Sequence, residues 1–367
     1  MTVEPQLDFI VRRDDLRQCK FVRAPELAEI ELEPGQALLR VTKFGFTSNN
    51  ITYAAFGEAM EYWSFFPAPE GWGRIPVWGY GEVVRSSHSA LRAGERAFGY
   101  LPMSTHLVVQ PDRVTEAGFI DGSPHRAALP SAYQQYTRVP SGNDEDRRYE
   151  DHQAILQPLF MTSFLIEDFL RDSDLFGAST VVLASASSKT ALGVAFMLSK
   201  NRPSACEVIG LTSPGNLAFC ERLGYYDRVV TYGDLESLPS DVPTVFVDMA
   251  GEGMLLQAVH QHFGNALRHS LLVGATHWDK RDPPPDLPGP VPQFFFAPTL
   301  IEKRRQDWGQ DGFGKRYGDA RSAFLPAAAD WLNIVHDSGP EAVERVYLDM
   351  VDGKMDPGVG QMLSLQK

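Results

Sequence analysis

The chain has 367 residues, of which 43% are hydrophobic and 22% are charged, and its formal net charge is −13 at pH 7. A chain of this length is typical of two domains, and its apolar content is enough to build a core in each. The acidic balance argues against nucleic acid and anionic membranes as partners, since both bind basic patches.

The sequence shows no sign of a membrane span or a secretory signal. No apolar run approaches the roughly 20 residues of a transmembrane helix, and the first residues lack a basic and then an apolar region. The three cysteines, Cys19, Cys206 and Cys220, form no C-x-x-C pair. Such sparse cysteines fit a reducing compartment and predict neither disulfides nor a structural zinc site, so we expect a cytoplasmic protein.

Residues 1 to about 115 are predicted to form short strands separated by turns. The strand regions are Gln36–Phe44, Ile75–Val84, Ala93–Tyr100 and Thr105–Pro111. Several short strands at this spacing indicate a small barrel or sandwich.

A polar cluster, Thr47–Tyr53, lies between two of these strands. The side chains of Asn50 and Tyr53 could bind a substrate carbonyl or a cofactor amide. The alternative is that the asparagines cap a helix or a turn. Both interpretations are open from the residues alone.

The middle of the chain changes character twice. Residues 116–152 are polar and are predicted to be largely exposed loop, although Tyr133 and Tyr136 could line the mouth of a pocket. Helical periodicity resumes at Leu156–Leu170, whose broad apolar face predicts a buried linking helix.

After residue 179 strands alternate with helices. The predicted strands are Thr180–Ala184, Cys206–Thr212, Arg228–Tyr232, Thr244–Met249 and Ser270–Ala275. This alternation predicts a parallel, doubly wound sheet, in which ligands bind beyond the carboxyl ends of the strands.

The first of these strands leads through small residues into a helix beginning near Ser188. A helix N-terminus after a tight turn suits a phosphate, so we interpret this stretch as a dinucleotide cradle. The residues after the second strand include no carboxylate, which would repel a 2′-phosphate, and this favours NADP(H) over NAD(H). The predicted cofactor-binding residues are Ser185, Ala186, Ser187, Ser188, Lys189, Thr190, Thr212, Ser213, Asn216, Ala250 and Gly274.

The last part of the chain begins with a proline-rich loop, 283–290. The apolar segment Gln293–Pro298 is predicted to be an edge strand that could pair with a second subunit near Phe294. Helices are predicted at Ala320–His336 and Pro340–Leu348.

This arrangement resembles the medium-chain dehydrogenase/reductase superfamily. The residues that carry the resemblance are Pro34-Gly35 with Leu38–Val41, Gly79–Val83, Ala93–Gly99, the strand and helix from Thr180, and Leu223-Gly224 before Val229. The resemblance implies an α/β fold with a GroES-like β-barrel substrate domain at 1–155 and 299–367. It implies a Rossmann dinucleotide-binding domain at 156–298.

The zinc-dependent members carry a Cys ligand, a Gly-His-Glu motif and a four-cysteine lobe, none of which this sequence has. The chain is therefore similar to the zinc-free quinone oxidoreductase and enoyl reductase branch. Ser213 stands where NADP-binding members have a serine, and Asn216 replaces their usual lysine. The segment Ser185–Thr190 departs from the glycine-containing loop of that branch and is typical of a divergent subgroup of unassigned function.

The resemblance implies a zinc-independent NADP(H)-dependent oxidoreductase that transfers a hydride to an activated C=C bond, a quinone or a carbonyl of a small molecule. Tyr53 is the predicted proton donor, acting as a neutral phenol because its ordinary pKa is about 10. Asn50 is predicted to orient the carbonyl, and His277 is an alternative acid. The alternatives are an NADP(H)-binding sensor or scaffold without turnover, and a non-redox ligand-binding protein.

Overall fold

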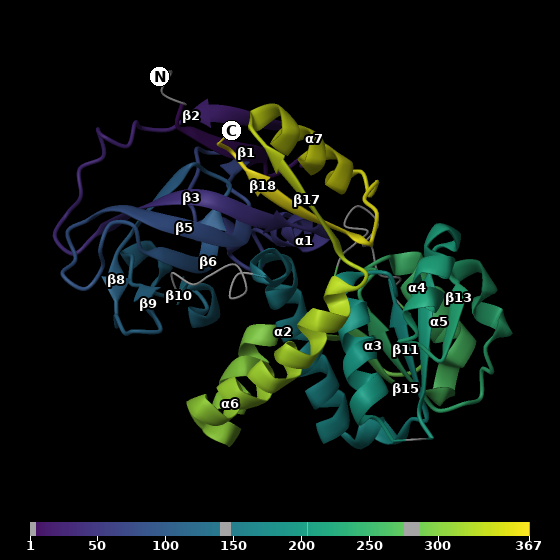
Figure 1. Cartoon of the computed structure of the whole chain (residues 1–367). Helices are drawn as coiled ribbons and strands as arrows, with labels where there is room; N and C mark the ends of the chain where they lie inside the picture. The colour runs from purple at the N-terminus through teal and green to yellow at the C-terminus, as the bar shows by residue number, and fades with distance from the viewer. Residues whose placement is uncertain (1–4, 140–147, 204, 275–285, 367) are drawn as a thin grey trace. The chain divides into compact units, whose positions relative to one another are not determined.

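A computed structural model describes residues 5–139, 148–203, 205–274 and 286–366. The chain forms two compact units (Figure 1), one made of residues 1–155 and 333–367 and the other of residues 156–332. The predicted fold class, a β-barrel-like unit joined to a doubly wound parallel sheet, is confirmed.

The first unit is built mainly of antiparallel strands. Its described residues form a three-stranded sheet in the order β2-β1-β4 and a nine-stranded sheet in which β3, β5 and β6 are central neighbours. The carboxyl-terminal β18 pairs antiparallel with β3, so the end of the chain completes the N-terminal sheet. The elements are β1 (Leu7–Arg12), β2 (Cys19–Arg23), β3 (Ala37–Phe46), α1 (Ser48–Ala55), η1 (Tyr62–Ser64), β4 (Trp72–Gly73), β5 (Pro76–Ser86), β6 (Arg96–Pro102), β7 (His106–Val109), β8 (Pro111–Asp112), β9 (Gly118–Asp121), η2 (Pro124–Arg126), η3 (Ser131–Tyr133), β10 (Gln135–Val139), β17 (Asn333–Ser338), α7 (Pro340–Val351) and β18 (Val359–Ser364).

The second unit contains a parallel sheet in the order β13-β12-β11-β14-β15-β16. Strands β11 and β14 are buried along their whole length, as expected for a sheet covered on both faces. The elements are α2 (Glu150–Asp172, which begins in the first unit), η4 (Asp174–Gly177), β11 (Thr180–Ala184), α3 (Lys189–Asn201), β12 (Glu207–Thr212), η5 (Pro214–Asn216), α4 (Leu217–Leu223), β13 (Arg228–Thr231), η6 (Tyr232–Ser237), β14 (Thr244–Asp248), α5 (Gly253–Phe263), η7 (Gly264–Ala266), β15 (Leu267–Leu272), β16 (Gln293–Phe294) and α6 (Ala297–Ala329).

The second unit extends to residue 332, beyond the boundary predicted at residue 299, because it includes helix α6. Its residues pack within the second unit, where Phe324 stacks on Phe160 with ring centroids 4.3 Å apart. The Arg304 guanidinium also pairs with Asp168 of α2 at 2.5 Å. The chain therefore returns to the first unit at Asn333, where β17 begins inside a region predicted to be helical. In the ranges that the structure describes, no helix combines the length and apolar character needed to cross a membrane.

Candidate functional site

The turn after β11 is packed tightly on the neighbouring strand β12. Ser185 has a positive φ of 53°, which starts the turn. The N–H of Ala186 donates to the Leu211 carbonyl at 2.9 Å, and the Tyr226 hydroxyl donates to the Ala186 carbonyl at 2.7 Å. A Cβ at Gly210 would lie 2.8 Å from the Ala186 Cβ, so only glycine fits there without a shift. Ala186 therefore fixes the turn, and its backbone groups are engaged within the protein.

Two serine hydroxyls stand at the start of α3. Ser188 is the N-cap, and its Oγ accepts the Ala191 N–H at 3.2 Å. The Oγ of Ser187 accepts a hydrogen bond from the Asn216 side chain at 2.9 Å, which ties the turn after β12 to the turn after β11. In both contacts the serine oxygen is the acceptor, so each O–H proton can be donated to an anion.

Lys189 and Thr190 begin the helix, and both are half-buried. The carbonyl of Thr190 accepts a hydrogen bond from Ser163 of α2 at 2.8 Å. A lysine at the positive end of a helix is disfavoured unless an anion is near. These residues therefore place a cation and the helix N-terminus at one position.

The remaining predicted cofactor residues lie at the carboxyl ends of three further strands or in the turns after them. Thr212 is buried at the end of β12, and Ser213 precedes η5, where its carbonyl accepts the Asn216 N–H at 3.0 Å. Ala250 follows β14 and is buried. Gly274 follows β15, where an added Cβ would lie 2.9 Å from the Met249 carbonyl oxygen. The parallel register, with Ala184 opposite Asp248, places these turns along one edge of the sheet.

Asp248 is a residue at this edge that the sequence analysis missed. It ends β14 with only 1% of its surface exposed, and one carboxylate oxygen accepts the N–H groups of Ala250 and Gly251 at 2.8 and 3.1 Å. Burial raises the pKa of the Asp248 carboxyl to about 6, although these hydrogen bonds oppose the rise. An aspartate ending an apolar strand just before Met-Ala-Gly was the signal in the sequence.

Tyr232 is the second residue that the sequence analysis missed. It follows β13, and its hydroxyl interacts with Ser185 and lies within electrostatic range of Asp248. Burial raises the pKa of Tyr232 to about 12, so it is a neutral phenol near neutral pH. Tyr232 thus adds a donor to the same edge, next to the turn after β11.

The residues at this edge fit a dinucleotide phosphate. They supply the hydroxyls of Ser187 and Ser188, the N-terminal N–H groups of α3 and the Lys189 ammonium. The turn after β12 carries no carboxylate. The carboxylate of Asp248 is buried and bonded to backbone N–H groups, so it presents no exposed negative charge.

Asn50, a predicted substrate-orienting residue, is held within the barrel unit. Its Oδ1 accepts the Thr47 N–H at 2.8 Å, which completes a capping box at the start of α1. Its Nδ2 donates to the Pro76 carbonyl at 2.9 Å. The geometry matches the capping alternative considered above, with both amide groups engaged.

Tyr53, the predicted proton donor, lies on α1 with 5% of its surface exposed. Its hydroxyl accepts a hydrogen bond from the Trp78 indole at 3.3 Å. Burial raises the pKa of Tyr53 above the ordinary value, so the phenol stays neutral. Its ring packs at 4.7 Å from the Tyr62 ring, within a group of buried aromatic side chains.

Two other expectations concern the site. His277 lies outside the described residues. Among the residues that are described, no group of three or more His, Cys, Asp and Glu side chains is arranged to hold a metal ion.

The fold is similar to that of several solved structures over nearly the whole chain. CurA from Vibrio vulnificus, in complex with NADPH, is 12% identical, with a TM-score of 0.62 and coverage of 98% of this chain and 99% of that one. A mutant enoyl thioester reductase from Candida tropicalis is 10% identical, with a TM-score of 0.57 and coverage of 98% and 100%. Mycobacterial Rv1454c, complexed with NADPH, is 14% identical, with a TM-score of 0.52 and coverage of 98% and 99%. The two units thus share the fold of these solved structures, a GroES-like domain with a Rossmann domain.

Residues 44–356 match the family DUF2855, described as protein of unknown function, and the chain belongs to this family. The search among curated proteins gave no match.

Proposed function

We propose that the protein is a zinc-independent NADP(H)-dependent oxidoreductase that transfers a hydride to an activated C=C bond, a quinone or a carbonyl of a small molecule. The observation that carries this proposal is the edge of the parallel sheet at the turn after β11. There, serine hydroxyls, a lysine and the start of α3 converge in a fold that CurA and Rv1454c share, both of which were crystallised with NADPH.

Each residue at the edge has a role in the proposal. Ser187, Ser188 and the N-terminal N–H groups of α3 would hold the pyrophosphate, with Lys189 as counter-ion. Ser213 and Asn216 would face the adenosine ribose, where the absence of a carboxylate favours the 2′-phosphate of NADP(H). Bound NADPH supplies hydride, and the protein contributes orientation and the exclusion of water.

In the first unit, the neutral phenol of Tyr53 is the proposed proton donor. Because burial raises the pKa of Tyr53, the hydroxyl keeps its proton at neutral pH and can donate it only to a developing oxyanion. Its oxygen already accepts the Trp78 N–H, which leaves the O–H proton directed elsewhere.

A second candidate function is an NADP(H)-binding sensor or scaffold without turnover. The engagement of Asn50 favours it, since both ends of that amide are bonded to the barrel backbone and neither is presented to a substrate. A sensor needs the phosphate turn and no proton donor.

The two functions separate in a two-step experiment. First, NADPH and NADH are titrated while tryptophan fluorescence is followed; saturable quenching with NADPH at lower concentration than with NADH is expected, and no saturation with either would refute cofactor binding. Second, quinones, enones and aldehydes are offered while NADPH absorbance is recorded. Turnover that falls in Tyr53→Phe and persists in Tyr80→Phe supports the proton-donor role, because the Tyr80 hydroxyl is bonded to the Glu150 carbonyl at 2.8 Å. Cofactor binding with no turnover of any substrate favours the sensor.

We also propose a cytoplasmic homodimer that pairs through β16. Phe294 lies on this strand and is 49% exposed. Among the described strands of the parallel sheet, β16 is an edge strand. Light scattering should give twice the monomer mass for the wild type and a lower mass for Phe294→Asp. An equal mass for both proteins would contradict pairing at this edge.

A further inference from the structure

Two buried hydroxyls in the described part of the first unit, those of Ser104 and Tyr100, lack a hydrogen-bond partner, and the one on Tyr100 lies among aromatic rings. The Tyr100 side chain is fully buried on β6, and its hydroxyl makes no hydrogen bond within the described part of the chain. The other buried tyrosines of this unit are bonded: Tyr136 to the Tyr100 carbonyl at 2.6 Å, Tyr347 to the Leu16 carbonyl at 2.6 Å, and likewise Tyr53, Tyr62 and Tyr80. Burying a hydroxyl without a partner is unfavourable, so this exception calls for a partner from outside the chain.

The surroundings of this hydroxyl are aromatic. The Tyr100 ring contacts Tyr133 at 4.8 Å, Trp78 at 5.1 Å and Phe65 at 5.3 Å between centroids, in tilted or edge arrangements. We call this group the aromatic cluster; its buried members are Tyr53, Tyr62, Phe65, Phe66, Tyr100 and Leu129, and half-buried side chains pack against it, among them Phe56, Met60, Trp78, Leu107 and Tyr133. Rings at these angles can also accept a further flat ring by stacking or edge contact.

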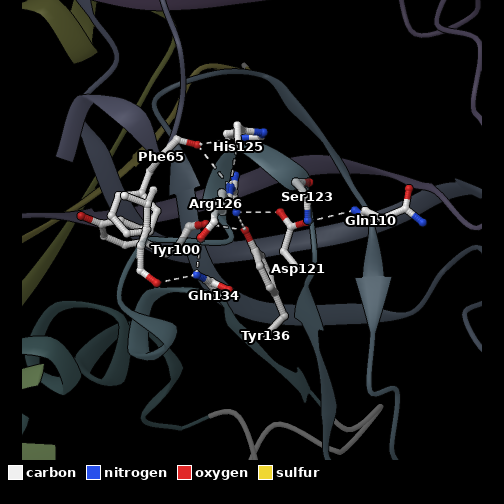
Figure 2. A network of polar contacts seen from close by, with 10 residues as sticks. Phe65, Tyr100, Gln110, Asp121, Ser123, His125, Arg126, Gln134 and Tyr136 are labelled. Carbon is white, nitrogen blue, oxygen red and sulfur yellow. Dashed lines mark hydrogen bonds and ion pairs between the residues drawn. The ribbon is translucent and has the colours of Figure 1, made fainter. Parts of the chain in front are cut away.

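The charged side chain that contacts the cluster in the described part of the chain, Arg126, is already paired; its guanidinium lies 4.6 Å from the Phe66 ring centroid. Arg126 pairs with the buried Asp121 carboxylate at 2.6 Å and donates to the Phe65 carbonyl at 3.2 Å and to the Tyr136 hydroxyl at 3.3 Å. Asp121 in turn accepts from Ser123 and from the Gln110 N–H (Figure 2). The ion pair is thus satisfied internally, and what remains for a ligand is a neutral phenol among aromatic rings.

The cluster can be reached from the side where the half-buried Tyr133 packs on the buried Tyr62. Tyr62 and Tyr133 lie on the short turns η1 and η3, and their two hydroxyls share a hydrogen bond at 3.3 Å. Neither turn is longer than three residues, so separating the two rings breaks their ring contact and one weak hydrogen bond rather than a helix or a strand. Movement of Tyr133 would uncover the Tyr100 ring, because the centroids of these two rings are 4.8 Å apart.

We propose that the aromatic cluster binds an uncharged aromatic molecule with an acceptor oxygen, such as an aryl ketone, and that the Tyr100 hydroxyl donates a hydrogen bond to that oxygen. That this molecule is the substrate of a reductase rests on the proposed function. The binding itself needs no cofactor. Tyr100 is then the residue that selects for the oxygen.

The test uses two probes of the same shape, 2-acetylnaphthalene and 2-ethylnaphthalene, in equilibrium dialysis with the full chain without cofactor. The wild type is expected to bind the ketone more tightly. Tyr100→Phe should weaken ketone binding about 2- to 10-fold, the value of one hydrogen bond, and leave the hydrocarbon unchanged. Tyr80→Phe, the matched control, should retain the preference because its hydroxyl lies outside the cluster.

Stability gives an independent readout. Tyr100→Phe should leave the urea midpoint unchanged or raise it, whereas Tyr80→Phe should lower it by removing a buried hydrogen bond. The proposal is overturned if the wild type does not prefer the ketone, if Tyr100→Phe retains the preference, or if Tyr100→Phe destabilises as much as Tyr80→Phe. Ketone binding without any NADPH binding would uphold the site and refute the reductase.

Discussion

Replacing Asp248 with asparagine tests the electrostatics of the sheet edge directly. The amide oxygen of asparagine can still accept the N–H groups of Ala250 and Gly251, so the turn is preserved while the charge is removed. Desolvation raises the pKa of the carboxyl from 3.8 to about 6, so the folded protein keeps a proton where the unfolded chain has released it. The stability from this proton is fully present below about pH 4 and is lost as the pH rises through about 6.

The magnitude follows from the two pKa values. Moving a pKa from 3.8 to about 6 corresponds to about 3 kcal/mol at about 1.4 kcal/mol per pKa unit. The free energy of unfolding of Asp248→Asn minus that of the wild type should therefore increase by about 3 kcal/mol between about pH 3 and pH 7.5. Urea unfolding of both proteins, followed by circular dichroism at several pH values, measures this difference.

A control variant isolates the effect of burial. Asp286 is an exposed carboxylate, so Asp286→Asn should differ from the wild type by a small amount that hardly changes across the same pH range. If the difference for Asp248→Asn is equally constant, the carboxylate is not destabilised by burial and the description of the edge is wrong. NADPH affinity measured on the same variant shows whether the charge has a role in the site.

Three further substitutions test particular contacts. Lys189→Ala should weaken NADPH binding about tenfold, as expected for loss of one charge-assisted contact. Lys200→Ala, at the other end of α3, should leave NADPH binding unchanged. Equal NADPH affinities for the two variants would show that Lys189 does not contact the cofactor. Gly193→Ala should lower the free energy of unfolding by about 1–3 kcal/mol, because the new Cβ would lie 2.4 Å from the Ser163 Oγ. Adding Ser163→Ala should recover part of this loss. A urea midpoint equal to that of the wild type would contradict the close packing of α2 on α3. Arg126→Met leaves a buried carboxylate without its cation and should cost about 3–5 kcal/mol in the same assay, and a loss below about 1 kcal/mol would show that the pair is solvated.

The sequence predicted the parallel sheet well because its strands are short apolar runs between amphipathic helices. Thr180–Ala184 and Thr244–Asp248 form strands within a residue of the predicted bounds. The prediction was poorer where tertiary contacts decide the outcome. Residues 333–336 end the helix predicted at Ala320–His336, yet they form the first part of β17 because pairing with β18 adds them to the first unit's sheet.

The site shows the same contrast. The predicted cofactor residues lie along one edge because strand ends in a parallel sheet share an edge, a consequence of topology that the sequence contains. Sequence could not reveal that Ala186 is engaged by Leu211 and Tyr226, since those contacts join segments 25 and 40 residues apart. For the same reason it did not reveal the Asp121–Arg126 pair, whose carboxylate and cation both come from a stretch predicted to be exposed loop.

The structure explains why the turn after β11 holds serine and alanine at positions 185–188, where a glycine-rich turn has glycine. A glycine-rich turn lets a ligand approach the backbone, but here the positions hold serine and alanine, and Ala186 faces the interior over Gly210. The Ala186 side chain needs room on its inner side, and Gly210 on β12 provides that room because it has no Cβ. Because the Ala186 backbone is engaged, anion binding at this turn, if the proposed function holds, would depend on the serine hydroxyls, the start of α3 and Lys189. A chain built this way should be more sensitive to loss of Ser187, Ser188 or Lys189 than one that binds phosphate with backbone N–H groups alone.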